Sequence, residues 1–103
     1  MALTKWGFVY TVGAADAIRR DEIGSDTCRL IAVGVPSTEL AARVSAELAD
    51  DGCELIEFCG AFGAREMAAV EVALASFGVP VGVVTYAGTA TTGLHRLFPE
   101  PGV

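Results

Sequence analysis

The chain has 103 residues, a length that suits one domain, and we expect residues 1–103 to form it around one modest core. A hydrophobic fraction of 52% against a charged fraction of 19% excludes an intrinsically disordered chain. The formal net charge of −6 argues against a nucleic acid or an anionic membrane as partner. Residues 39–71 hold eight acids and two arginines, which equals the entire net charge.

Residues 1–6 contain no apolar signal-peptide core, so the sequence predicts a cytoplasmic protein. Residues 72–94 carry no formal charge, but glycines, a proline and threonines interrupt them. We interpret this stretch as a buried strand followed by a glycine-rich loop, not as a membrane span. Cys28, Cys53 and Cys59 are odd in number and lack C-x-x-C spacing, which predicts reduced thiols and neither disulfides nor a structural zinc site.

The first half of the chain indicates two strands and one helix. Residues 5–12 alternate in hydrophobicity, as in a strand, and residues 28–35 are nearly all apolar, as in a strand covered on both faces. Between them, Asp16 could cap a short helix, although the pattern is weak. Ser37 can cap a helix over about residues 38–50, which Gly52 would close.

The second half repeats this unit. We expect a strand at 54–60, a turn at 61–63, a helix at 64–77 ended by Gly78, a strand at 79–86, and a tail at 87–103 with a short helix through Leu94, His95 and Phe98. Short connections between alternating strands and helices predict an α/β domain. Its mainly parallel sheet would have about four strands, two main crossover helices and that short C-terminal helix. So few helices cannot cover both sheet faces, which favours a homo-oligomer.

Ligands of open parallel sheets bind beyond the carboxyl ends of the strands. The most informative end is residues 59–65, where Gly60, Ala61, Phe62 and Gly63 precede a helix N-terminus and Arg65 follows in its first turn. Together these residues suit a small anionic ligand such as a carboxylate or phosphate. The alternative is a tight structural turn with Arg65 paired to Glu66 or another surface acid. The segment is neither a P-loop nor a G-x-G-x-x-G, so no cofactor is predicted.

Glu57 and Cys59 are the candidate catalytic groups. Alternation places both on one face of the predicted strand at 54–60. Glu57 would act as general acid or base if it is desolvated, and Cys59 as nucleophile or second proton carrier. The alternative is that Glu57 forms a structural salt bridge at an edge or subunit interface and that Cys59 packs in the core.

The last strand contributes a third candidate catalytic residue, Tyr86, which could donate a hydrogen bond to a substrate oxygen or simply shield the core edge. Thr85 and Gly88 are added to the ligand-binding set because they lie at the same strand end. His95 is the one histidine of the sequence; we interpret it as a surface residue unless the tail folds back over the site. Four further side chains are interpreted as core: Trp6, Phe8, Met67 and Phe77.

Three segments carry a resemblance: VGVP (residues 33–36), LIEFCGAFG (55–63) and VPVGVVTYAG (79–88). In them the sequence resembles an uncharacterised bacterial family of short single-domain α/β proteins with a strand-end E-x-C-G-x-F-G. The resemblance implies a candidate site and no reaction. The Cys-Gly strand end is also distantly similar to aspartate and glutamate racemases, which use two facing cysteines. A two-cysteine racemase is disfavoured here because Cys28 and Cys53 precede their strands.

Two functions follow as hypotheses. The first is a cofactor-independent enzyme acting on a small carboxylate or carbonyl metabolite at the carboxyl edge of the sheet. The second is a non-catalytic module in which the same turn binds a small anion, or in which the uncharged stretch and the one-sided sheet form an oligomer interface. No metal site is expected in either case.

Overall fold

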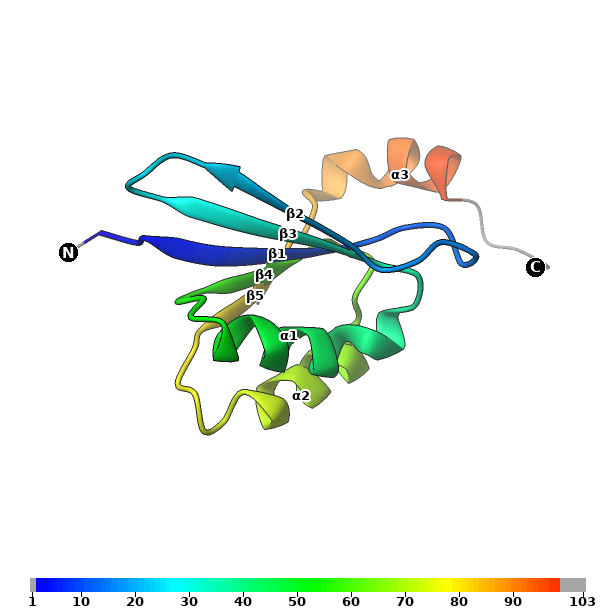
Figure 1. The fold of residues 1–103 in the computed structure, drawn as a ribbon. Coiled ribbons are helices and arrows are strands. Elements are labelled where there is room, and N and C mark those ends of the chain that lie inside the picture. Colours follow the sequence, from blue (N-terminus) through cyan, green and yellow to red (C-terminus); the bar gives the residue numbers. More distant parts are fainter. Residues whose placement is uncertain (1, 99–103) are drawn as a thin grey trace.

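A computed structural model describes residues 2–98 as a five-stranded sheet with helices on either side (Figure 1). The elements are β1 (Lys5–Thr11), β2 (Arg19–Gly24), β3 (Arg29–Val35), η1 (Thr38–Leu40), α1 (Ala41–Asp50), β4 (Ile56–Phe58), α2 (Ala64–Ala73), β5 (Val81–Val83), η2 (Gly88–Ala90) and α3 (Thr91–Leu97). The strand order is β2-β3-β1-β4-β5, and all neighbours are parallel except β2 and β3. This confirms the expected α/β class, the mainly parallel sheet and the short C-terminal helix.

Strand β2 corrects the prediction for residues 13–27. Asp16 does not cap a helix, because its carboxylate accepts the Gly13 N–H at 2.8 Å and closes a local turn. The chain then forms an antiparallel hairpin with β3. Charged residues fill the first four positions of this edge strand, from Arg19 to Glu22, so hydrophobic alternation could not indicate it.

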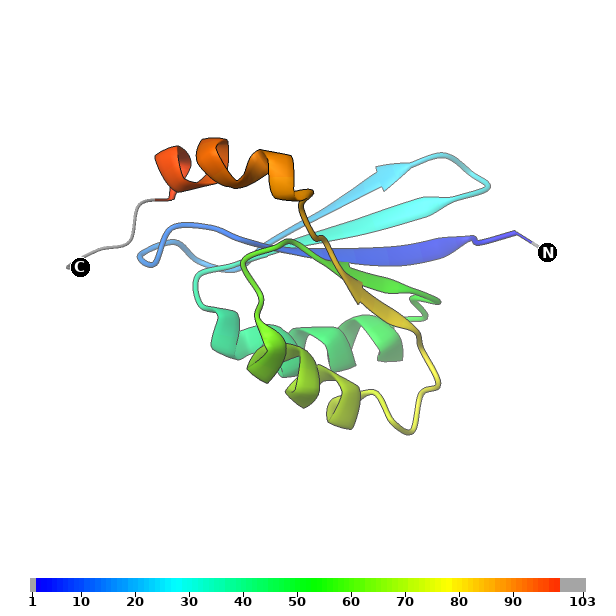
Figure 2. The ribbon, with the colours of Figure 1, turned by 180° about the vertical axis from the view of Figure 1, so that it is seen from behind.

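Helices α1 and α2 pack together against one face of the sheet (Figures 1 and 2). The core consists of buried aliphatic side chains together with Phe58, Phe62 and Cys53, and Met67 packs against it as expected. Gly7 lets α1 approach closely, because a Cβ on Gly7 would lie 2.9 Å from Cδ1 of Leu48. The central strand therefore buries its small residues under the helices.

The other face of the sheet is not covered by α1 or α2, and we call it the open face. Its side chains, read from the strand register, are Trp6, Phe8, Tyr10, Arg19, Asp21, Ile23, Leu30, Ala32, Gly34, Glu57 and Gly82. The assignment of Trp6 and Phe8 to the core was wrong, since both are half-buried on this face. The expectation that β3 is covered on both faces was also wrong, and Phe77 is exposed. Alternation predicts which residues share a face, but it does not tell which face receives the helices.

Glycines end the two main helices near the expected positions. Gly52 follows α1 with a φ of 96°, and Gly78 has a φ of 68°, a region that other residues rarely adopt. Helix α2 is shorter than predicted: it ends at Ala73, and a turn leads from there to Gly78. None of the helices within residues 2–98 has the length and apolar character that crossing a bilayer requires.

Two carboxylates, those of Glu54 and Asp51, form hydrogen bonds and ion pairs near the amino end of β1. Glu54 accepts the N–H groups of Thr4 and Lys5, at 2.8 and 3.0 Å, and the Thr4 hydroxyl at 2.7 Å. These hydrogen bonds lower the pKa of Glu54 below its ordinary value. Asp51 binds Arg20 and Lys5, and the hydrogen bond from Arg20 is the main cause of its lowered pKa.

We therefore expect stability to fall in acid. A carboxylate whose pKa is lower in the folded chain stabilises the fold above its ordinary pKa and loses that effect as the pH falls through the folded value. Glu54→Gln should reduce the free energy of unfolding at about pH 7, and its difference from the wild type should shrink towards about pH 3. Urea unfolding at both pH values measures this. Glu71→Gln is the control, because Glu71 is exposed on α2; a Glu54→Gln difference that is constant with pH would contradict the assignment.

Candidate functional site

An open cleft of about 760 Å³ lies between the carboxyl ends of the strands and α3. Its lining residues come from four segments: Thr11 at the end of β1, Cys59, Gly60 and Ala61 after β4, Tyr86 after β5, and Thr91, Leu94, His95 and Phe98 from the α3 region. The volume falls within the range of small-molecule sites. The cleft is therefore at the edge of the sheet that the sequence predicts.

The β4 end forms the floor of the cleft. The Cys59 N–H donates to the Val9 carbonyl at 2.9 Å, and the Val84 N–H donates to the Phe58 carbonyl at 2.9 Å, so both neighbouring strands hold this segment. A Cβ on Gly60 would lie 2.8 Å from Cε2 of Tyr86 and 3.2 Å from the Val84 carbonyl oxygen. Glycine at position 60 thus allows the Tyr86 ring to lie across the turn.

The rest of the predicted turn lies behind the cleft. Phe62 is 3% exposed, and its ring meets Phe58 edge to face with the centroids 5.0 Å apart. Gly63 precedes α2 and donates its N–H to the Glu66 carboxylate at 3.0 Å. Neither residue is among those that line the cleft. Phe62 anchors the turn in the core. The Gly63 N–H, which was expected to bind an anionic ligand, is already hydrogen-bonded to the Glu66 carboxylate.

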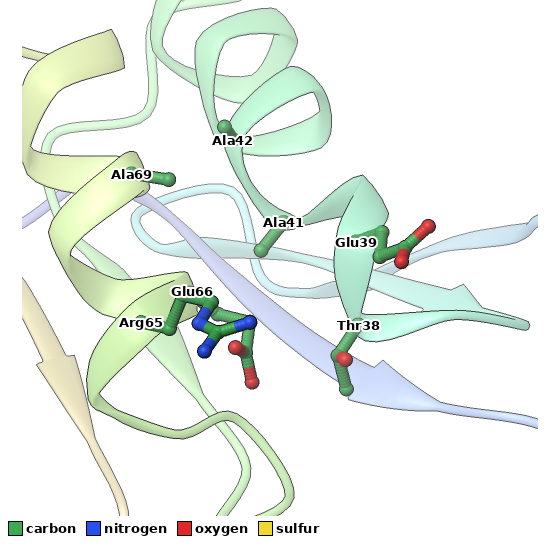
Figure 3. Close-up of a pocket in the computed structure, with 7 residues that line it drawn as sticks. All are labelled: Thr38, Glu39, Ala41, Ala42, Arg65, Glu66 and Ala69. Atoms are coloured by element: carbon green, nitrogen blue, oxygen red, sulfur yellow. The ribbon is translucent and has the colours of Figure 1, made fainter.

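Arg65 lies on a second, smaller hollow of about 170 Å³ between the first turns of the α1 and α2 region (Figure 3). Thr38, Glu39 and Glu66 line the same hollow, together with alanines of both helices. Within residues 2–98 Arg65 forms no ion pair, so the alternative of a salt bridge to Glu66 does not hold there either. The structure separates Arg65 from Cys59, which lines the cleft.

Three other predicted residues also lie outside the cleft lining. Glu57 is half-buried in the middle of β4, on the open face, opposite Phe8 and Gly82 of the neighbouring strands. Thr85 is exposed after β5. Gly88 begins η2, and its carbonyl accepts the Thr91 hydroxyl at 2.7 Å. Of the candidate catalytic groups, Cys59 and Tyr86 share the cleft and Glu57 does not.

His95 is the main cleft residue that sequence reasoning left on the surface. Helix α3 presents Thr91, Leu94, His95 and Phe98 to the cleft, and their spacing of three and four residues is that of one helical face. This periodicity was the signal that could have identified the group. It does not show where the helix packs, because that depends on tertiary contacts.

The cleft is free of carboxylates among its described lining residues, in a chain with thirteen acids. His95 supplies an imidazole, Cys59 supplies a half-buried thiol, and Tyr86 supplies a phenol. Leu94, Phe98 and Ala61 form the apolar part. The arrangement suits a small molecule with one polar, oxygen-bearing end. Within residues 2–98 no group of three or more histidine, cysteine or acidic side chains is arranged to hold a metal ion.

The three thiols should differ in reactivity. Cys53 is 2% exposed and burial raises its pKa, so its thiolate is both inaccessible and scarce. Cys59 and Cys28 are half-buried. Iodoacetamide should label Cys59 at least about tenfold faster than Cys53 in the folded chain. Mass spectrometry of tryptic peptides measures the rates, unfolded protein provides the control, and equal rates in the folded chain would contradict the structure.

Comparison with known proteins gave one finding. The pattern of a family described as a family of unknown function (DUF6506) matches residues 4–99, which is nearly the whole chain. A search of curated proteins found no match.

Proposed function

Since the chain belongs to the DUF6506 family, whose description assigns no activity, the site itself must suggest the function, and we propose that the protein binds a small carbonyl or carboxylate metabolite in the cleft. The observation that carries this proposal is the convergence of Cys59, Tyr86 and His95 around one cavity of about 760 Å³. An open cleft of this volume can hold a metabolite of modest size.

The lining chemistry supports this ligand class. A ligand oxygen would accept hydrogen bonds from Tyr86, Thr11 or His95, while the hydrocarbon part would contact Leu94 and Phe98. A negative ligand would face no carboxylate among the described lining residues, which favours this ligand class. Arg65 has no part in this proposal, because it lines the other hollow.

A second candidate function is catalysis, and it rests on the presence of Cys59 and His95 in one lining. In this proposal His95 moves the proton and Cys59 assists as nucleophile or acid, so the role expected for Glu57 passes to His95. Free thiols at positions 28, 53 and 59 fit a reducing compartment, and we place the protein in the cytoplasm as part of the same proposal.

The experiment is a thermal-shift screen of the full chain with small carbonyl and carboxylate compounds. A ligand that binds the folded chain, at a concentration of about one hundred times its Kd, should raise Tm by several degrees. Tyr86→Ala and His95→Gln should remove most of that shift, whereas Cys28→Ser, outside the cleft lining, should retain it. NMR of the recovered compound then separates the candidates: an unchanged ligand indicates binding, and a product that is lost in a Cys59→Ser variant that still binds indicates catalysis. No stabilising compound, or shifts that survive both cleft substitutions, would overturn the proposal.

A further inference from the structure

The open face of the sheet is a surface that the small-molecule site leaves unexplained. Trp6 and Phe8 of the central strand lie on it, next to Leu30 and Ala32 of β3, and all four are half-buried. Helices α1 and α2 lie on the opposite side in both views (Figures 1 and 2). A sheet face of this composition is normally covered.

Helix α3 lies on the same side as the open face, towards the carboxyl ends of the strands (Figures 1 and 2). Its close packing within the described chain is with η2, and no strand packs against it comparably. Leu97 is 71% exposed and Phe98 is 72% exposed. Helix α3 thus adds an exposed apolar side chain, Leu97, on the side of the molecule where the open face lies.

The open face carries little net charge, unlike the helices on the other side of the sheet. It holds one arginine and two acids, Arg19, Asp21 and Glu57. Arg19 and Asp21 already form an ion pair at 2.8 Å. By contrast, η1, α1 and α2 hold five acids and two arginines. Two copies that meet through their open faces keep their acidic helices apart, at opposite ends of the assembly.

The area of the open face suits a weak dimer. Five strands about 4.8 Å apart and up to seven residues long give a flat footprint of roughly 450 Å². This footprint is smaller than the accessible surface of about 800 Å² that one partner contributes to a standard interface, so we expect a dimer that dissociates at low concentration.

From these observations we infer that a second copy of this chain covers the open face, in a two-fold dimer. Trp6, Phe8 and Leu30 of each copy form the centre of the interface, where aromatic residues contribute most. Each copy presents the same patch, because a two-fold interface is self-complementary. The cleft adjoins this interface, since Thr11 follows the open-face residue Tyr10 directly.

The test is sedimentation equilibrium of the full chain from about 100 µM down to about 1 µM, the range in which weak dimers dissociate. We expect a dimer for the wild type. Ile23→Lys places a charge on the open face, at a side chain that is 56% exposed, and should weaken dimerisation at least about tenfold. Val72→Lys is the matched control: it makes a comparable change at a 79% exposed side chain on α2 and should leave the dimer intact.

Fluorescence of Trp6 gives a second readout, because the chain has one tryptophan and it lies on the open face. Its emission should shift to the red on dilution of the wild type and already be red-shifted in Ile23→Lys. Circular dichroism checks that both variants fold. A wild type that is monomeric at about 100 µM, or equal weakening by Ile23→Lys and Val72→Lys, would overturn the inference. A monomer would mean that a different partner, or water, meets this face.

Discussion

Replacing Phe58 by alanine should lower the free energy of unfolding by about 3 to 5 kcal/mol. Phe58 is the largest of the fully buried side chains; it lies in β4, and its ring packs edge to face on Phe62. The substitution removes this pair and leaves a cavity under the turn that forms the floor of the cleft. Because β4 is central between β1 and β5, the surrounding strands cannot collapse freely into the space.

Urea unfolding measures the loss, and Phe77→Ala is the matched control. Phe77 is 41% exposed, so its removal should cost about 1 kcal/mol or less. If Phe58→Ala and Phe77→Ala lost similar amounts, the core described here would be wrong. In the Phe58→Ala chain we also expect faster labelling of Cys59, because the turn that follows β4 loses its anchor.

Replacing Gly60 by alanine should cost about 1 to 3 kcal/mol of stability and should distort the cleft. A Cβ at position 60 would meet the Tyr86 ring at 2.8 Å and the Val84 carbonyl oxygen at 3.2 Å. The ring can turn away, but the carbonyl belongs to the backbone segment that holds β4 and β5 together. The effect is spatial, since Gly60 does not have a positive φ.

Gly82→Ala provides the control, because no heavy atom lies within 4 Å of a Cβ built there and Gly82 lacks a positive φ. It should change stability by about 1 kcal/mol or less. Tyr86→Ala should recover part of the loss when combined with Gly60→Ala, because the double variant removes the closest contact. Strictly additive losses in this cycle would show that the ring does not lie over Gly60.

The sequence could predict the strands and helices that alternate along the chain from β3 to β5. The crossover helices and the helix cap at Ser37 depend on residues close in sequence, so local patterns can indicate them. The structure confirms the cap, because the Ser37 hydroxyl accepts the Glu39 N–H at 3.2 Å. Strand β2 could not be predicted, because it is an edge strand with charges on both of its faces. The place of Trp6 and Phe8 could not be predicted either, because alternation is the same whichever face the helices cover.

The candidate site was predictable as an edge of the sheet but not as a set of side chains. Parallel strands bring their carboxyl ends together, so Cys59, Gly60 and Tyr86 meet as expected. Arg65 lies one helical turn too far along, on the side of α2 that faces α1. His95 lines the cleft because of where α3 lies beside the strand ends, which no local pattern specifies.

The measurement that tests the central claim most directly is a fragment screen of the full chain by two-dimensional NMR. If the cleft is the small-molecule site, carbonyl and carboxylate fragments will shift the amide signals of Thr11, of residues 59–61 and of His95. The signals of Thr38 and Arg65, around the smaller hollow, will stay in place. Fragments that shift the second group and leave the first unchanged would contradict the account, and so would a screen in which neither group responds.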